Sequence, residues 1–176
     1  MPRFWLFALP LALAALAAGV WFAHGHYAPR SSEAAALAAL QQARYPDPEG
    51  RSQALAQWSG KLRVVNFWAS WCAPCREEMP DFDDLARQYR EHGVEFIGIA
   101  VDTPANVQAF LQRQPVGYPI LVGEGGADSL ARALGNTTGA LPYTLVLDPE
   151  GRVVKQHLGR LPRATLDAVL RENLAH

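Results

Sequence analysis

Two cysteines separated by two residues lie in the run NFWASWCAPCREEMP, which covers residues 66–80. They are Cys72 and Cys75, and the chain of 176 residues contains no other cysteine. Glu78, a carboxylate, follows three residues after the second cysteine. Such residues could bind a metal, staple the chain as a disulfide, or exchange electrons as a pair of thiols.

The cysteines directly follow a predicted buried strand and open a predicted helix. Residues 62–68 form a mostly apolar run with β-branched and aromatic side chains, as in a strand buried on both faces, and residues 73–91 have a helical pattern. Cys72 therefore falls at a helix N-terminus, where free N–H groups and the helix dipole favour a thiolate. At about 100° per residue, Cys75 faces the core together with Met79, Phe82, Ala86 and Tyr89. One exposed, activated sulfur and one sheltered sulfur suit thiol–disulfide exchange, in which the first attacks and the second resolves the mixed disulfide.

The two other kinds of chemistry fit the pair less well. Structural zinc needs four ligands, and the sequence has neither a second cysteine pair nor two histidines at zinc-ligand spacing nearby. A disulfide between Cys72 and Cys75 would close a very short loop, so it would remove little entropy from the unfolded chain. We therefore expect a redox-active pair and no metal site.

Glu78 is expected on the buried side of the same helix. It lies about 60° from Cys75 around the helix axis, whereas Glu77 lies about 160° away and points to solvent. These angles are approximate because Pro80 removes one helical N–H. A carboxylate at the edge of a core should have a raised pKa and could carry protons to and from the cysteines. The alternative is a boundary residue that pairs with an arginine.

Strand and helix patterns alternate along the rest of the chain. The turn residues at 148–151 predict a hairpin, and the two prolines and glycine at 45–50 predict a break in structure. Further strands are expected at 94–101, 118–122, 143–147 and 152–158, and further helices at 33–44, 104–114, 128–134 and 165–174. This order predicts an α/β fold with a mixed β-sheet flanked by helices.

The first part of the chain is expected to be a targeting segment. The run from Phe4 to Ala23 has no charged residue, and as a helix it would be long enough to cross a bilayer. Arg3 favours an inside N-terminus and an exported remainder. The alternative is a signal peptide cleaved near residues 15–17. We expect an N-terminal transmembrane helix or signal segment in residues 1–23, a spacer in 24–44 and the folded domain in 45–176.

Charge excludes one class of partner. Sixteen basic residues are balanced by seventeen acidic ones, and no basic run stands out. The sequence therefore offers no electrostatic basis for binding nucleic acid.

The two motifs FWASWCAPCREEMP and GALPYTLVLDPEGRV together resemble the membrane-anchored disulfide reductases of the TlpA and ResA type. The resemblance covers residues 45–176, and it implies a thioredoxin fold, an extracytoplasmic location and reduction of disulfides in partner proteins. The family's motif glutamate falls on Glu78. Its loop proline, normally cis and facing the active site, falls on Pro142.

The resemblance also implies where a substrate protein would dock. An extended substrate segment could hydrogen-bond to the backbone of Leu141 as an added strand. Trp71, beside Cys72, is interpreted as part of the docking surface rather than the core. The substrate-binding residues expected are Trp71, Ala73, Pro74, Leu141 and Pro142.

Asn66 marks a departure from cytosolic thioredoxins, which carry a buried aspartate six residues before the first cysteine. An asparagine cannot titrate, so proton handling is inferred to fall to Glu78. Alternatively, Asn66 is a polar residue satisfied within the strand and has no catalytic part.

Two other functions stay open at this point. The nearest is a thioredoxin-like reductase dedicated to cytochrome c maturation, which shares the scaffold and the acidic residue. A copper-delivery module is less well supported, because it would need C-x₃-C spacing and a distal histidine, for which His157 is the candidate. For the reductase we expect exported disulfide proteins as substrates and a transmembrane thiol reductase as electron donor. No cofactor is expected beyond the Cys72–Cys75 disulfide, and the location is periplasmic, with residues 4–23 as the anchor.

Overall fold

The structure is a computed structural model that describes residue 19 and residues 30–175. The chain divides into two compact units, Met1–Ala34 and Ala35–His176, and all contacts reported below lie within the second. Within the described residues, no helix is both long and apolar enough to cross a membrane. Apart from Gly19, the expected anchor lies outside the described residues, and so do the first residues of the expected spacer.

A five-stranded mixed sheet forms the centre of the domain. Its strand order is β5-β4-β3-β6-β7, with β3, β4 and β5 parallel and with β6 antiparallel to both β3 and β7. The strands are β3 (Leu62–Trp68), β4 (Val94–Ala100), β5 (Ile120–Val122), β6 (Tyr143–Leu147) and β7 (Val153–Leu158). The predicted mixed sheet is therefore present, and the apolar run 62–68 is its middle strand, buried along its whole length.

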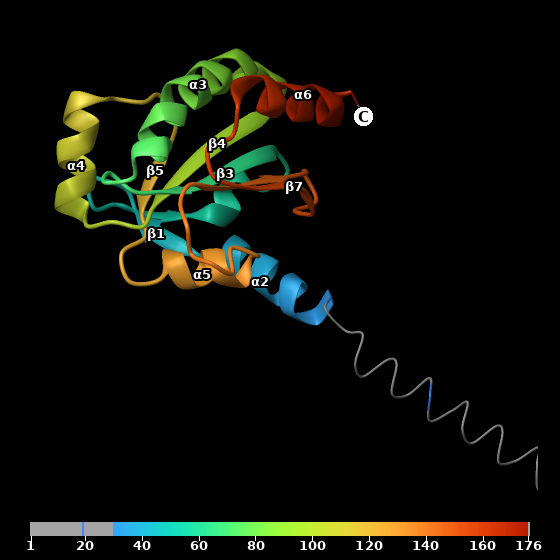
Figure 1. Ribbon diagram of the computed structural model, residues 1–176. Helices are drawn as coiled ribbons and strands as arrows, with labels where there is room; N and C mark the ends of the chain where they lie inside the picture. Colours follow the sequence, from blue (N-terminus) through green and yellow to red (C-terminus); the bar gives the residue numbers. More distant parts are fainter. Residues whose placement is uncertain (1–18, 20–29, 176) are drawn as a thin grey trace, which may run out of the picture. The chain divides into compact units, whose positions relative to one another are not determined.

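Helices cover both faces of this sheet (Figure 1). The helices are α2 (Arg30–Gln42), α3 (Ala73–Tyr89), α4 (Pro104–Arg113), α5 (Ala127–Ala133) and α6 (Arg163–Leu174). Side chains of α3, α4 and α6 form one core with one face of the sheet, and those of α5 and the second half of α2 form the other core. Residues of β3 alternate between the cores: Val64 and Trp68 belong to the first, and Val65 and Phe67 to the second. This alternation follows from the two-residue period of a strand.

Local sequence signals explain where the helices begin and end. Thr103 caps α4, since its Oγ accepts a hydrogen bond from the Asn106 N–H at 3.3 Å, and Pro104 occupies the first turn. Helix α3 ends at Tyr89, two residues earlier than expected, and a short 3₁₀ turn leads to Gly93. Gly93 has a φ of +79°, a left-handed conformation that reverses the chain into β4 and that glycine adopts without strain.

A short hairpin precedes the main sheet, where the sequence predicted only a break. Strands β1 (Arg44–Pro46) and β2 (Ser52–Ala54) pair across the pentapeptide Asp-Pro-Glu-Gly-Arg at 47–51. The same pentapeptide recurs at 148–152 and joins β6 to β7.

The two pentapeptide turns have the same hydrogen bonds. In the first, Asp47 accepts bonds from the backbone N–H and the Nε of Arg51, at 2.8 Å each. In the second, Asp148 accepts the equivalent bonds from Arg152, at 2.8 and 2.6 Å. The glycine has a φ near +85° in both turns. The break at 45–50 is therefore a hairpin turn, because its residues specify the same local contacts as those at 148–152.

Candidate active site

The two cysteines lie where the chain passes from β3 into α3. Cys72 is the N-cap of α3 and Pro74 lies in its first turn. The Cys75 backbone N–H donates to the Cys72 sulfur at 3.3 Å, so a free helix N–H points at that sulfur. The two sulfurs form a disulfide. The prediction that Cys72 lies at a helix N-terminus is confirmed, but the expectation of an exposed sulfur is wrong, because Cys72 is 5% exposed and packs with the core.

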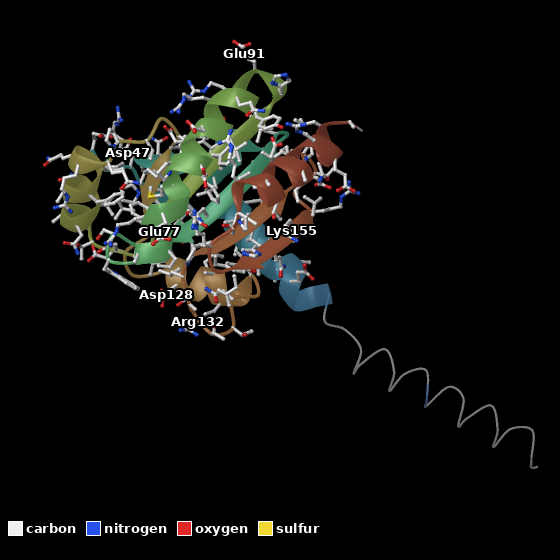
Figure 2. The ribbon with its side chains drawn as sticks, turned by 45° about the horizontal axis from the view of Figure 1, so that its top comes forward. Asp47, Glu77, Glu91, Asp128, Arg132 and Lys155 are labelled. Carbon is white, nitrogen blue, oxygen red and sulfur yellow. A yellow bond between two sulfur atoms is a disulfide. The ribbon has the colours of Figure 1, made fainter. Side chains whose placement is uncertain are left out.

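The buried face of α3 is also as predicted. Cys75 is fully buried, and so are Met79 and Phe82 on the same side of the helix. Glu77 is exposed and projects from α3 into solvent (Figure 2). Helical periodicity alone therefore assigned one sulfur to the core, despite the proline inside α3.

Glu78 is completely buried. Its Oε1 accepts a hydrogen bond from Asn66 Nδ2 and its Oε2 accepts one from the Leu161 backbone N–H, both at 2.9 Å. Burial raises the pKa of Glu78 to about 7, although the bonds from Leu161 and Asn66 and the charge of Arg160 act in the opposite direction. The alternative of a boundary residue paired with an arginine is wrong, since the carboxyl is inside the core and both oxygens have neutral partners. A carboxyl with this pKa exchanges protons readily near neutral pH.

Asn66 connects Glu78 to a second strand. Its Nδ2 also donates to Thr144 Oγ1 at 3.0 Å, and Asn66 and Thr144 are directly opposite each other in β3 and β6. The alternative interpretation, in which Asn66 is satisfied within its own strand, is therefore wrong, because its partners lie in α3 and β6. The contacts of Thr144 and of the Leu161 amide were not foreseen. One signal was present: Asn66 and Thr144 are polar residues within apolar strands, and buried polar groups need partners.

A second set of hydrogen bonds fixes the loop before the cysteines, which the sequence analysis did not foresee. Asp102, two residues after the end of β4, accepts bonds from the Ser70 backbone N–H at 2.9 Å and from Ser70 Oγ at 2.6 Å. Burial alone would raise the pKa of Asp102, but hydrogen bonds from Ser70 and Asn106 outweigh it and hold the pKa below its ordinary value. Asp102 is thus an ionised anchor for the segment that leads into Cys72.

The residues expected to bind substrate lie on two segments. Trp71 is 65% exposed, and Ala73 and Pro74 are also exposed. Leu141 is half-buried and Pro142 is buried, and the peptide bond between them is cis, as the resemblance implied.

The loop after β7 connects Pro142 with Glu78. The Gly159 N–H donates to the Pro142 carbonyl at 2.8 Å, and two residues further on the Leu161 N–H donates to Glu78. Arg160, between them, lies 3.6 Å from the carboxylate of Glu77. The proline loop, the loop after β7 and the first turns of α3 therefore form one hydrogen-bonded unit beside the disulfide.

Metal ligands are not clustered in the described part of the chain. No group of three or more histidine, cysteine, aspartate or glutamate side chains there could hold a metal ion. His157 lies in β7, with its Nε2 3.0 Å from the Arg160 carbonyl oxygen.

A mixed sheet with a cysteine pair at the N-terminus of the helix after its central strand defines the class of thioredoxin-fold thiol–disulfide oxidoreductases. The chain belongs to the Redoxin family, whose model matches residues 25–170. It is similar to the thiol-disulfide oxidoreductase ResA of Halalkalibacterium halodurans, with 34% identity over 158 residues that cover 89% of this chain and 87% of that protein. The resemblance to ResA-type oxidoreductases is thus confirmed.

Solved structures agree with this assignment. A thioredoxin-related protein from Neisseria meningitidis serogroup B is 31% identical, with a TM-score of 0.68 over 76% of this chain and 100% of that chain. A thiol:disulfide interchange protein of the thioredoxin family from Chlorobium tepidum is 28% identical, with a TM-score of 0.64 over 75% of this chain and 92% of that chain. The protein is a thiol–disulfide oxidoreductase with a thioredoxin fold.

Proposed function

We propose that this protein reduces disulfides in exported partner proteins through the Cys72–Cys75 dithiol. The observation that carries the proposal is the difference between the two sulfurs. Cys72 caps α3 and accepts a helix N–H, whereas Cys75 is fully buried behind it. In the dithiol state the free helix N–H groups favour a thiolate on Cys72, and the core favours a thiol on Cys75.

In the proposed reaction the Cys72 thiolate attacks a sulfur of the substrate disulfide, which forms a mixed disulfide and releases one substrate thiolate. The Cys75 thiol then gives its proton to the Glu78 carboxylate. The resulting Cys75 thiolate attacks the Cys72 sulfur, and the second substrate thiolate leaves. Two electrons pass to the substrate, Cys72 and Cys75 become a disulfide, and the proton on Glu78 passes to a departing thiolate.

Glu78 suits this role because of its position and its pKa. It is one helical turn after Cys75 on the same buried face of α3, and residues three apart on a helix are neighbours. With a pKa of about 7, Glu78 can both accept and release a proton at neutral pH.

The docking surface in this proposal consists of Trp71, Ala73 and Pro74 on one side and the loop with Leu141 and Pro142 on the other. Three of these residues are exposed around the disulfide, and Leu141 is half-exposed. An extended substrate segment would hydrogen-bond to the backbone of Leu141, as in strand addition to an edge.

We further propose an extracytoplasmic protein held at the membrane by residues 4–23, with a spacer between the anchor and a catalytic domain that begins at Ala35, since Ala36 and Leu40 pack in its core. The support is the uncharged apolar run and the curated ResA relatives. The reduced pair would be regenerated by a transmembrane thiol reductase, and no cofactor beyond the disulfide is needed.

The reduction potential of the Cys72–Cys75 pair tests the direction of electron flow. Equilibration of the purified protein in dithiol buffers should give a potential well below the roughly −180 to −210 mV of an oxidising secretory compartment. A potential near −120 mV, that of a strong disulfide oxidant, would overturn the proposal. Substrate preference is tested with disulfide peptides, among them a peptide with the C-x-x-C-H motif of c-type haem attachment, whose preferential reduction would indicate cytochrome c maturation.

A further inference from the structure

Asn66 Oδ1 is a buried acceptor with no hydrogen-bond partner in the described structure. The side chain lies in the middle of β3 and is 1% exposed. Its other polar atom, Nδ2, makes two good bonds, to Glu78 Oε1 and to Thr144 Oγ1. A buried polar atom without a partner costs free energy, so its presence beside the central carboxyl calls for a physical reason.

The carboxyl group of Glu78 faces a donor at each oxygen. Asn66 Nδ2 points at Oε1, and the Leu161 N–H points at Oε2. This arrangement satisfies an ionised carboxylate, which only accepts hydrogen bonds. A protonated carboxyl has one O–H that needs an acceptor, and the backbone N–H of Leu161 can never become one. One of the partners must therefore change when Glu78 takes up a proton.

The amide of Asn66 can make that change without altering its shape. A half-turn about its last side-chain bond exchanges Oδ1 and Nδ2, which have nearly the same size. Oδ1 would then accept from the Glu78 Oε1–H and from the hydroxyl of Thr144, which can donate as well as accept. One amide atom lacks a partner in each state: Oδ1 while Glu78 is ionised, and Nδ2 once the amide has turned over.

We propose that Asn66 is a positioning residue that follows the proton on Glu78. Its amide donates to Oε1 while Glu78 is ionised, and it turns over and accepts from Oε1–H once Glu78 is protonated, while Thr144 reverses its hydroxyl. The proton is thereby placed on the oxygen that faces β3, and the bond from Leu161 is kept in both states. This inference rests on the proposed role of Glu78 as proton carrier.

The surroundings of Glu78 allow this proton to be observed separately in the oxidised protein. Cys72 and Cys75 do not titrate in the disulfide, and burial raises the pKa of Tyr118 far above neutrality. Arginine stays charged at all accessible pH values, and Asp167, a carboxylate of α6 that contacts this core, accepts a hydrogen bond from the Tyr89 hydroxyl at 2.6 Å. The groups near Glu78 that carry or can carry charge are Cys72 and Cys75 from α3, Tyr118 ahead of β5, His157 opposite Thr144 in β7, and Arg160 after β7. His157→Gln serves as the control, because His157 lies directly opposite Thr144 in the pairing of β7 with β6.

The first test is NMR spectroscopy of the isotope-labelled oxidised protein and of its His157→Gln variant, over a titration from about pH 5 to about pH 9. The carboxyl carbon of Glu78 reports its protonation, and the side-chain amide protons of Asn66 report the orientation of the amide. We expect the nuclear Overhauser contacts of these protons with Thr144 to be present at high pH. They should be lost at low pH, with the same midpoint as the Glu78 carbon. Contacts that persist unchanged through the titration of Glu78 would overturn the proposal.

The second test is the Asn66→Leu variant, with the pKa of Glu78 as the readout. An amide that bonds both forms of the carboxyl favours the ionised form only by the difference in strength between the two bonds, so its removal should raise the pKa of Glu78 by less than about one unit. A fixed donor favours only the ionised form, so a rise of about two units in the pKa of Glu78 in Asn66→Leu would overturn the proposal. If this variant does not fold, the first test still decides. Failure of the proposed function is seen separately, as an undiminished rate of disulfide exchange in Glu78→Gln.

Discussion

The buried carboxyl of Glu78 should make the oxidised protein less stable as the pH rises towards neutrality. Its pKa is raised from the ordinary value of 4.5 to about 7, chiefly by burial. Between these two values the folded state keeps a proton that the unfolded state has lost, so unfolding releases a proton. The free energy of unfolding must therefore fall with rising pH across this interval, and it should be independent of Glu78 below and above it.

The size of this effect follows from the interval. It spans about 2.5 pH units, and each unit corresponds to about 1.36 kcal/mol, so the total loss is about 3 kcal/mol. Replacing Glu78 by glutamine removes the titration and keeps the shape of the side chain. Glutamine offers an acceptor oxygen to the Leu161 N–H and an NH2 donor to an Asn66 amide that has turned over, so it takes the place of the protonated carboxyl.

The assay is urea unfolding of the oxidised wild-type protein and Glu78→Gln at closely spaced pH values from about 4 to about 9. All other titrating groups are common to both proteins and cancel in the difference. The free energy of unfolding of wild type minus that of Glu78→Gln should decrease by about 3 kcal/mol between pH 4.5 and pH 7 and then level off. A difference that stays flat, or that increases with pH, would refute the argument that burial dominates the titration of this carboxyl.

Three further predictions concern the segment around the disulfide. Cys75→Ser lacks the resolving sulfur, so a mixed disulfide between Cys72 and a substrate protein should accumulate and be visible by mass spectrometry under non-reducing conditions; no adduct would contradict the assigned order of attack. Trp71→Ala should leave the urea midpoint nearly unchanged, because the side chain is 65% exposed, and should raise KM for protein disulfides several-fold; an unchanged KM would exclude a docking role. Asp102→Ala should lower the free energy of unfolding by about 2–4 kcal/mol, because both hydrogen bonds from Ser70 are lost. Ser70→Ala removes only the bond from Oγ, so its loss should be smaller. Equal losses for the two variants in urea titrations would contradict the role of Asp102 as the anchor of this segment.

Much of the fold could be predicted from local patterns. The order of strands and helices, the buried strand 62–68 and the buried face of α3 all follow from periodicities of two and 3.6 residues. Cys75 and Glu78 were assigned to the core on that basis alone. Strand β5 is shorter than expected, Ile120–Val122 instead of 118–122. Tyr118 is nevertheless buried. The apolar pattern therefore predicted the burial of this residue correctly but wrongly included it in the strand.

The partners of Glu78 could not be predicted in the same way. Asn66 is 12 residues away in the sequence and Leu161 is 83 residues away. Such contacts depend on which strands are neighbours and on their register, which a single sequence does not encode in any local pattern. The pairing of Asn66 with Thr144 across β3 and β6 is visible only once the strand order is known. The bond from Leu161 is harder still, since it uses a backbone N–H that every residue except proline possesses.

The twin Asp-Pro-Glu-Gly-Arg turns give the domain an internal replicate. One sequence of five residues adopts one set of hydrogen bonds in two different surroundings within a single molecule. A Cβ atom added at Gly50 would meet nothing within 4 Å, whereas one added at Gly151 would collide with the side-chain amide of Gln41 from α2. The backbone strain of an alanine is common to both sites, because both glycines have the same left-handed conformation. The difference between Gly50→Ala and Gly151→Ala in the free energy of unfolding is therefore the contribution of tertiary contacts. Both substitutions are measured in the same protein, solvent and temperature.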